Sequence, residues 1–318
     1  MEVEVLRFPN PFPYSETNSY LINRCLLIDT GVYTNNSVEL IEKFLKERNL
    51  DFSIDLVITH PHVDHFGLAY LFEEVYAHKH ACNRLKDCAK NYFKLCMNHF
   101  EIAGVPKVLI DELVKRVTNT YMSLAKPCNR CKDIGDKIKI GDEVFEVLHT
   151  PGHTYCHISL YHKESGSLFC GDTVLERTVP TPLIEPIDEN SRHPVLEQYI
   201  STVKRLYELD IAKVYPGHGD FKSDFKKILR WYLDRWMNKS IEIWRRANNS
   251  TPFEVVEEIY GVNRIIFLTT SEVLAHLDFL HLNDFVEVYD GRYRRCGDLN
   301  ELVDFWNDIK FSLSESGR

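Results

Sequence analysis

The stretch that decides the fold is THPHVDHFG, residues 59–67. Four potential metal ligands, His60, His62, Asp64 and His65, stand within six residues. Pro61 favours an extended backbone at the residue before it, so His60 and His62 point to the same side of the chain. Asp64 and His65 stand where a helix is predicted to begin, so their side chains turn toward a neighbouring position. We therefore expect this one loop to supply ligands to two metal ions.

Three later fragments complete the ligand set: TPGHT at 150–154, CGDT at 170–173 and YPGHG at 215–219. Each follows a short apolar strand and places one His or Asp in a turn with glycine, where the missing Cβ lets backbone and ligand approach closely. Imidazole nitrogen and carboxylate oxygen suit zinc, iron or manganese. One such histidine alone is more often a hydrogen-bonded turn residue. The predicted metal ligands are His60, His62, Asp64, His65, His153, Asp172 and His218, enough for two sites that share a carboxylate.

In order and spacing, these strings resemble the metallo-β-lactamase superfamily. The resemblance covers roughly residues 1–230 and implies an α/β fold, a four-layer αββα sandwich with the metals at one edge between the sheets. It implies that His60, His62 and His153 hold the first metal and that Asp64, His65 and His218 hold the second, with Asp172 as the bridge. The presence of both residues of the Asp64-His65 pair resembles the glyoxalase II-like branch, so an antibiotic-degrading lactamase is not expected.

The expected function is a binuclear metal-dependent hydrolase, with a metal-bridging hydroxide as the nucleophile. The expected cofactors are two divalent ions, zinc first, with iron or manganese open, and Asp64 and Asp172 are the predicted catalytic residues. A thioester is the preferred substrate, followed by a lactone or another ester. The alternative from another class is an endoribonuclease acting on single-stranded RNA. Asp29, Thr59 and Thr154 are expected to orient the imidazoles, and for His157 an orienting and a purely structural role both stay open.

Composition limits the partners of the chain. Lys and Arg number 38 against 47 Asp and Glu, a net charge of −9, which argues against a surface built to bind nucleic acid. A small-molecule substrate is expected, without membrane or nucleic acid, and a homodimer is left open. The beginning of the chain lacks a signal-peptide pattern, and nine scattered cysteines indicate a reducing compartment, so the expected location is cytoplasmic. The lone C-x-x-C at 128–131 is not expected to bind metal.

A helical insertion is predicted at about 83–126, as two helices over 84–103 and 107–124 separated by Gly104-Val105-Pro106. It either caps the active site or packs as a structural hairpin. Its apolar residues, among them Tyr92 and Phe93, exceed what one hairpin buries against itself. Before the insertion, a helix is predicted from 37 to 48 with Ser37 as its N-cap, and a strand end carrying His78 and His80.

The tail, 248–318, is predicted to form a small second domain beside the hydrolase domain of residues 1–230. Two helices precede two short strands joined by Asp290-Gly291, the order of a winged helix, which resembles the lactamase-beta-like subgroup of the superfamily. Residues 231–310 hold nine basic and fourteen acidic residues, a net charge of −5. A DNA reader presents Arg, Lys, Asn or Gln on its second helix, whereas the polar groups here are Glu272, His276, Asp278 and His281. We expect this domain to pack or dimerise.

Overall fold

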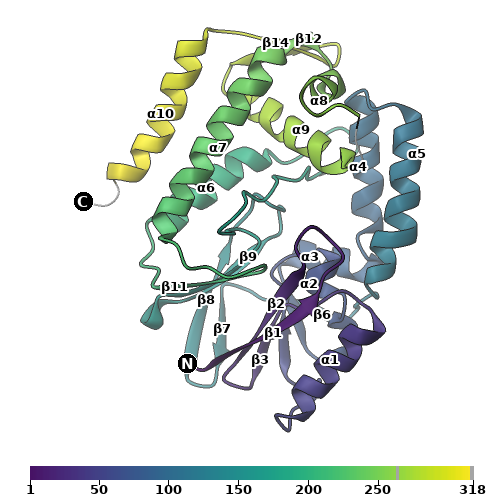
Figure 1. Cartoon of the computed structure of the whole chain (residues 1–318), viewed down its shortest axis with the longest axis vertical. Helices are drawn as coiled ribbons and strands as arrows, with labels where there is room; N and C mark the ends of the chain where they lie inside the picture. Colours follow the sequence, from purple (N-terminus) through teal and green to yellow (C-terminus); the bar gives the residue numbers. More distant parts are fainter. Residues whose placement is uncertain (263–264, 316–318) are drawn as a thin grey trace.

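Two β-sheets lie face to face in the computed structural model, which describes residues 1–262 and 265–315 (Figure 1). The first sheet consists of β1 (Val3–Pro9), β2 (Glu16–Ile22), β3 (Leu26–Ile28), β4 (Asp55–Val57), β5 (Val75–Ala77) and β6 (Cys131–Asp133). The second sheet consists of β7 (Lys137–Ile140), β8 (Glu143–His149), β9 (Ile158–His162), β10 (Ser167–Gly171) and β11 (Lys213–Pro216). The sandwich that the sequence predicts is confirmed.

The strands follow the chain in spatial order within each sheet. In the first sheet the order is β1 to β6, antiparallel from β1 to β3 and parallel from β3 to β6. In the second sheet the order is β11-β10-β9-β8-β7, and only β10 and β11 are parallel. The sequence analysis missed β6, because its three residues are partly or fully exposed and show no apolar alternation.

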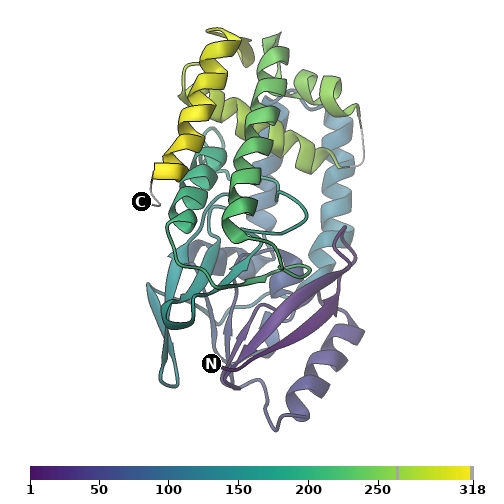
Figure 2. The same ribbon diagram turned by 60° about the vertical axis from the view of Figure 1, so that its left-hand side comes forward.

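Helices cover the outer faces and extend beyond one end of the sandwich (Figures 1 and 2). They are α1 (Asn35–Lys46), α2 (Val63–Phe66), α3 (Lys79–Asp87), α4 (Lys90–Ile102), α5 (Lys107–Arg116), α6 (Val195–Tyr207), α7 (Phe225–Arg246), α8 (Pro252–Tyr260), α9 (Ile266–Leu282) and α10 (Leu299–Glu315). A π-helical turn spans Val117–Tyr121, and short 3-10 turns span Ala69–Leu71, Met122–Leu124 and Lys163–Ser165.

Alternating side chains of the strands build the layers. In β3, Leu26 and Ile28 enter the core between the sheets, whereas Leu27 enters the core shared with α1 and α3. In β10, Phe169 faces the core between the sheets and Leu168 faces the core shared with α6. These two strands thus bury both faces, one against the other sheet and one against helices, as the αββα order of layers requires.

Two local predictions before the insertion were wrong in detail. The first long helix begins at Asn35, and its N-cap is Thr34, whose hydroxyl accepts a hydrogen bond from the Ser37 backbone nitrogen at 3.1 Å. Both Thr34 and Ser37 are capping residue types, so the sequence did not separate them. The strand β5 ends at Ala77, and His78 is the N-cap of α3 rather than part of a strand end.

The insertion forms three main helices, not two. The chain breaks between α3 and α4 at Cys88 and Ala89, whose φ angles of 51° and 62° lie in the left-handed region. Neither glycine nor proline stands at this break, so the sequence predicted one continuous helix there. The second break falls between α4 and α5, where Gly104-Val105-Pro106 was expected to end the helix.

The tail follows the predicted order of elements. After α7 come β12 (Asn248–Ser250), α8, α9 and the hairpin of β13 (Val286–Tyr289) and β14 (Arg292–Arg295), with strand order β12-β14-β13. One apolar cluster runs without interruption from α6 and α7 into the tail and the insertion. The division into two domains and the winged-helix identity of the tail stay predictions.

The second helix of the tail, α9, differs from its expected setting. His276 is fully buried and Asp278 pairs with Arg192, the two closest atoms lying 2.5 Å apart. These two side chains therefore do not face solvent, as the sequence analysis assumed, because α9 packs between α6, α7 and α8.

One disulfide is present, between Cys82 of α3 and Cys131 of β6. The other seven cysteines are free thiols, five of them buried. The C-x-x-C pair is therefore split, with Cys131 bonded to Cys82 and Cys128 buried as a thiol. Among residues 1–262 and 265–315, no helix is long and apolar enough to cross a lipid bilayer.

Candidate metal centre

The seven predicted ligands meet at one edge of the sandwich, because each follows the carboxyl end of a strand. His60, His62, Asp64 and His65 follow β4 and enter α2, His153 follows β8, Asp172 follows β10, and His218 follows β11. These strand ends lie at the same edge of the two sheets. All seven side chains are buried or nearly so, which brings strongly polar groups together away from water.

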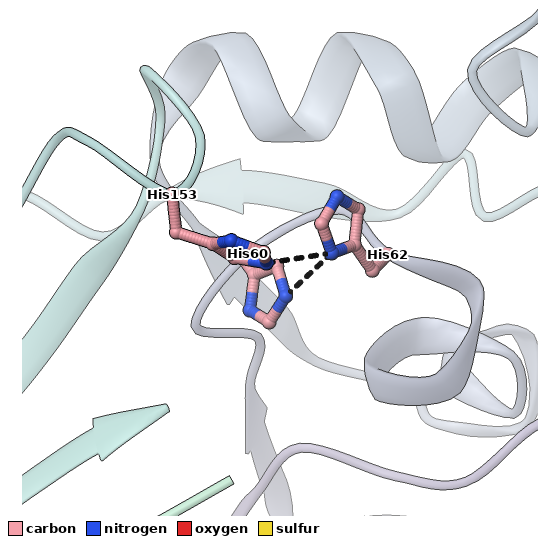
Figure 3. Close-up of side chains that lie close together, drawn as sticks. All are labelled: His60, His62 and His153. Carbon is pink, nitrogen blue, oxygen red and sulfur yellow. Dashed lines mark hydrogen bonds between the residues drawn. The ribbon is translucent and has the colours of Figure 1, made fainter. Parts of the chain in front are cut away.

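The first set of ligands is His60, His62 and His153 (Figure 3). His62 Nδ1 lies 2.9 Å from His60 Nε2 and 3.2 Å from His153 Nε2, so the three nitrogens converge on one point. The set contains imidazoles only. Asp172 Oδ2 lies beside this set, 4.0 Å from His60 Nε2 and 3.8 Å from His153 Nε2.

The second set is Asp64, His65 and His218. His65 Nε2 lies 3.3 Å from His218 Nε2, and Asp64 Oδ2 lies 3.5 Å from His218 Nε2. Asp172 also reaches this set, with Oδ1 at 3.6 Å from His65 Nε2 and Oδ2 at 3.3 Å from His218 Nε2. Asp172 therefore stands between the two sets, in the position that the bridging role requires.

Hydrogen bonds on the outer side fix the tautomers of four imidazoles. His218 Nδ1 donates to the Glu16 carbonyl at 2.7 Å, and His153 Nδ1 donates to the Thr181 carbonyl at 3.0 Å. His65 Nδ1 lies 2.9 Å from a carboxylate oxygen of Asp29. His60 Nδ1 donates to the Thr59 hydroxyl at 3.0 Å, since that hydroxyl gives its own proton to Asp29. In its neutral form, each of these rings therefore directs its Nε2 lone pair at the centre.

These residues fit a pair of divalent cations. Four Nε2 lone pairs, one Nδ1 and two carboxylates converge, and Asp172 Oδ1 is a buried oxygen without a hydrogen-bond partner among the described residues. Converging lone pairs repel one another unless a cation lies between them. Nitrogen donors oriented by outer carbonyls and carboxylates are the usual arrangement around a protein-bound metal. The donor chemistry thus accounts for every inward-facing atom of the cluster.

Two glycines allow this approach, as the turn motifs predicted. A Cβ on Gly217 would lie 2.3 Å from Asp172 Oδ1, so only glycine lets the 215–219 turn pass the bridge. Gly171 has φ 46°, and a Cβ there would lie 2.6 Å from Thr59 Oγ1. Both contacts are far shorter than a carbon atom tolerates, so the close packing of the centre depends on these two residues.

The electrostatics differ between the two sets. Burial, with the neighbouring histidines, holds the pKa values of His60 and His62 well below the usual range for imidazole. Burial also acts on His65, but Asp172, Asp64 and Asp29 outweigh it and raise the pKa of His65 well above the usual range. Burial opposes ionisation of Asp172, yet His218 and His65 hold its pKa well below the usual range.

Two of the three predicted orienting residues, Asp29 and Thr59, contact ligand imidazoles, and His157, whose role the sequence left open, also contacts the centre. Asp29 accepts from the Thr59 backbone nitrogen and hydroxyl, both at 2.7 Å, and so links both ligand sets. His157 accepts a hydrogen bond from the Asp172 backbone nitrogen at 3.1 Å and stacks on His60, with ring centroids 4.9 Å apart. The Thr154 hydroxyl is buried and makes no hydrogen bond to a ligand imidazole, so its predicted orienting role was wrong.

The sequence analysis missed two neighbours of the second set. Asn10 Nδ2 donates to Asp64 Oδ2 at 2.7 Å and to Thr17 Oγ1 at 2.8 Å. The Tyr14 ring stacks on His218 with centroids 4.4 Å apart. Both residues lie in the β1–β2 connection, which the fold brings across the centre. Nothing in the local sequence marks Asn10 as more than a turn residue.

A cavity of about 520 Å³ extends from the centre between the sandwich and the helices above it. Its floor carries His62, Asp64, His153, Asp172 and His218. Its walls are mainly apolar and come from four regions: the β1–β2 connection, the insertion, the β10–α6 connection and the start of α9. The wall residues include Phe12, Pro13, Tyr14, Tyr92, Phe93, Leu113, Val117, Tyr121, Val179, Leu183, Ile265, Phe267 and Leu268.

The insertion and the tail meet over this cavity. Phe267 of α9 lies 5.6 Å from Phe93 and 5.4 Å from Phe100, measured between ring centroids. The Phe253 backbone nitrogen donates to the Ala103 carbonyl at 3.0 Å. Tyr92 also lines the cavity, but its hydroxyl donates to the Ile184 carbonyl at 2.9 Å. The Arg84 guanidinium lies over the Tyr92 ring, 4.0 Å from the ring centroid. Tyr92 therefore also holds the structure together, and Phe93 is the cleaner probe of the wall.

Residues 14–218 match the family model described as metallo-beta-lactamase superfamily, and the matched range contains all seven ligands. The chain belongs to the metallo-beta-lactamase superfamily. Membership implies divalent-metal binding and hydrolase chemistry, in agreement with the two His/Asp clusters. The superfamily model ends at His218, so it does not extend into the tail.

Relatives and solved structures of the superfamily agree with this assignment. A probable metallo-hydrolase, YqjP of Bacillus subtilis, is 28% identical over 309 residues, which cover 91% of this chain and 95% of the relative. The human acyl-coenzyme A thioesterase MBLAC2 is 28% identical over 204 residues, 61% of this chain and 68% of the relative. The crystal structure of TTHA1429, a metallo-beta-lactamase family protein from Thermus thermophilus, matches with a TM-score of 0.76 at 22% identity, over 92% of this chain and 98% of that one. This structural match supports the fold alone.

Proposed function

We propose that the protein hydrolyses a small thioester with an apolar acyl group, using two divalent ions, zinc in the first instance. The observation that carries the proposal is the cavity of about 520 Å³, whose polar floor holds the ligands and whose walls are largely apolar. A carbonyl placed over Asp172 would leave its acyl chain among Phe93, Phe267 and Leu268. Pockets of this size with few polar groups suit small organic ligands.

The ligands divide between the two ions as the converging atoms suggest. His60, His62 and His153 would hold one ion, Asp64, His65 and His218 the other, and Asp172 would bridge them. When bound, such a pair supplies a hydroxide at neutral pH and polarises the carbonyl that it attacks. The chain itself orients the imidazoles through Asp29 and the Thr181 carbonyl. The apolar walls keep bulk water away from the reacting carbonyl.

The acid–base properties of the cavity favour a thioester over an ester or an amide. Apart from the ligands, the titratable groups that line the described cavity are Tyr14, Arg84, Tyr92, Arg116 and Tyr121. Burial and the nearby Asp172 raise the pKa of Tyr14 to about 12, and burial raises the pKa values of Tyr92 and Tyr121. None of these three phenols is an efficient proton donor near pH 7. A thiol has an ordinary pKa of about 8.5, so a thiolate leaves without a proton, whereas an alkoxide or an amine anion does not.

The relative named acyl-coenzyme A thioesterase supports the same substrate class. The rival activity, cleavage of single-stranded RNA, finds little support in the charge of the chain, −9 overall. A polyanion requires a basic track beside the centre. The partner that we propose is therefore a small molecule, not nucleic acid.

The test is a substrate panel on the zinc-loaded protein: acyl thioesters of increasing chain length, matched oxygen esters, lactones and single-stranded RNA. We expect turnover of thioesters, with kcat/KM rising with chain length until the cavity is filled. Activity confined to RNA would refute the proposal, and activity on lactones with none on thioesters would correct the substrate class.

Paired variants test the role of the walls. Phe93→Ala and Phe267→Ala should each raise KM for long-chain thioesters more than for short ones, because each lost apolar contact costs about 1–3 kcal/mol of discrimination. Phe285→Ala is the matched control, since Phe285 packs on Phe305 in the tail and does not line the cavity. Equal losses across chain lengths would assign the insertion and α9 a packing role only.

A further inference from the structure

A second cluster of ligand-type side chains lies on the second sheet, away from the candidate metal centre. Glu143 opens β8, His162 ends β9, and Glu164 lies in the turn that follows. One ligand atom of each lies within 4.8 Å of the others. The strand β9 starts beside the centre at Ile158, and four residues at about 3.3 Å each carry His162 about 13 Å along the sheet. The cluster therefore cannot share an ion with the centre.

His162 has the setting of an oriented metal ligand. The side chain is only 3% exposed, and its Nδ1 lies 2.8 Å from the Ser165 hydroxyl. That hydroxyl gives its own proton to Ser167 at 2.8 Å, so Nδ1 must be the protonated nitrogen and the donor. A neutral ring then leaves Nε2 as a bare lone pair. Outer hydrogen bonds of this kind fix the tautomer of histidines that bind metals.

The Nε2 atom of His162 is buried and has no hydrogen-bond partner within residues 1–262 and 265–315. The nearest charged atom is Oε2 of Glu143 at 2.8 Å, which is a second acceptor facing the lone pair. Two acceptors at this distance repel each other unless a positive charge lies between or beside them. The other oxygen of Glu143, Oε1, lies 3.3 Å from the α-amino group of Met1, so Oε2 remains directed at the imidazole.

We propose that Glu143, His162 and Glu164 bind a third divalent ion, with His162 Nε2 and the two carboxylates as ligands. One imidazole and two carboxylates suit zinc or manganese. Bonds from zinc to nitrogen and oxygen are about 2.0–2.2 Å long, so two donors of one ion lie about 3 Å apart, as His162 and Glu143 do. The ion would join the start of β8 to the end of β9 and to the 163–165 turn. Its role is structural, because no cavity residue belongs to the cluster.

The experiment counts zinc on the full-length protein after removal of metals with a chelator and dialysis against Zn²⁺. We expect the wild type to bind one zinc more than His162→Gln. Glu164→Gln should weaken the same ion at least tenfold, and because Glu164 is exposed this variant has little effect on folding. Asp142→Asn is the matched control, since it removes an exposed acidic charge beside Glu143 without removing a ligand.

Metal content is independent of the substrate, so the outcome does not depend on the proposed function. A second readout is thermal: zinc should raise the Tm of Asp172→Ala by more than it raises the Tm of the double variant Asp172→Ala with His162→Gln. Equal zinc counts for the wild type, His162→Gln and Glu164→Gln would overturn the proposal.

Discussion

The two ligand sets of the candidate centre start from the same loop, share Asp172 and differ in charge. The first set, His60, His62 and His153, contains only imidazoles, and burial lowers their pKa values. In the second set, carboxylates surround His65 and His218, and Asp172 in particular raises the pKa values of both against the effect of burial. Burial thus lowers the pKa of every imidazole in both sets. The number of adjacent carboxylates decides whether the final pKa lies below or above the usual range.

This difference predicts a division of metal preference. Imidazole-only sites suit zinc, whereas a site with a carboxylate of its own also accepts harder ions such as manganese. The first set would thus be the selective zinc site and the second the more permissive one. Four experiments test the comparison, from the largest expected effect to the smallest.

Asp172→Ala removes the one candidate ligand that both sets contact. It should therefore abolish the difference in metal preference between the two sets. We expect turnover to fall by more than about 10³-fold, because several kcal/mol of charge stabilisation depend on the paired ions. Zinc content measured by mass spectrometry should fall at both sets, while circular dichroism should show an unchanged fold. Near-normal activity of the variant would mean that Asp172 does not bridge.

Two variants, His153→Ala and His218→Ala, should show the metal preference of each set separately. His218→Ala keeps the three imidazoles of the first set and should retain one tightly bound zinc in the presence of excess manganese. His153→Ala keeps the second set with Asp64 and should exchange its ion for manganese more readily. Competition dialysis measures both variants side by side. Identical exchange in the two variants would contradict the proposed division.

Asn10→Ala should affect the second set only, because Asn10 donates to Asp64 and not to a ligand of the first set. Loss of such an outer hydrogen bond weakens metal affinity by about 10–100-fold. Zinc titration should therefore show one weakened and one unchanged binding step. Asn91→Ala, a change at an exposed asparagine of α4, should leave both steps unchanged. Two weakened steps for Asn10→Ala would show that the sets are coupled.

His276 in α9 shows what burial does to a histidine whose charged neighbour is the Lys239 cation rather than a carboxylate. Burial lowers its pKa to about 3 from the ordinary 6.5, and Ser240 holds its Nδ1 at 2.8 Å. The folded state keeps this ring neutral, so its contribution to stability is fully present above pH 6.5 and is lost as the pH falls toward 3. Between pH 7.5 and 5.5 the loss amounts to about 1.4 kcal/mol.

Urea unfolding of the wild type and of His276→Gln at both pH values isolates this contribution. The variant should lose about 1.4 kcal/mol less than the wild type across the same pH interval. The comparison uses the difference between two pH values within each protein, so a general destabilisation by the substitution cancels. An equal pH dependence in the two proteins would show that His276 is not held neutral.

Local sequence patterns identified the sandwich and its ligand motifs. Short apolar segments predicted the strands that precede three of the turns, and the glycine turns predicted where His153, Asp172 and His218 stand. The same reasoning failed where no local signal existed. The left-handed Cys88 and Ala89 carry no turn residue, and the three residues of β6 show no alternation because they lie at the edge of the sheet.

Partners distant in sequence could not be predicted from local pattern. Asn10 and Asp64 are 54 residues apart, and Cys82 and Cys131 are 49 residues apart. Their contacts depend on how the sheets and the insertion pack, which no spacing rule encodes. For the same reason the sequence placed His276 on a surface, although α9 is buried by helices from three other parts of the chain.

The sequence by itself determined which side chains are the candidate metal ligands, because ligand chemistry and the turn that presents it are both local properties. The tertiary structure decided the environment of those ligands. It set carboxylates beside His65 and not beside His62, and it brought Phe93 of the insertion and Phe267 of the tail together over Asp172. Electrostatic fields and cavity walls act through space, so they depend on residues that only folding makes neighbours.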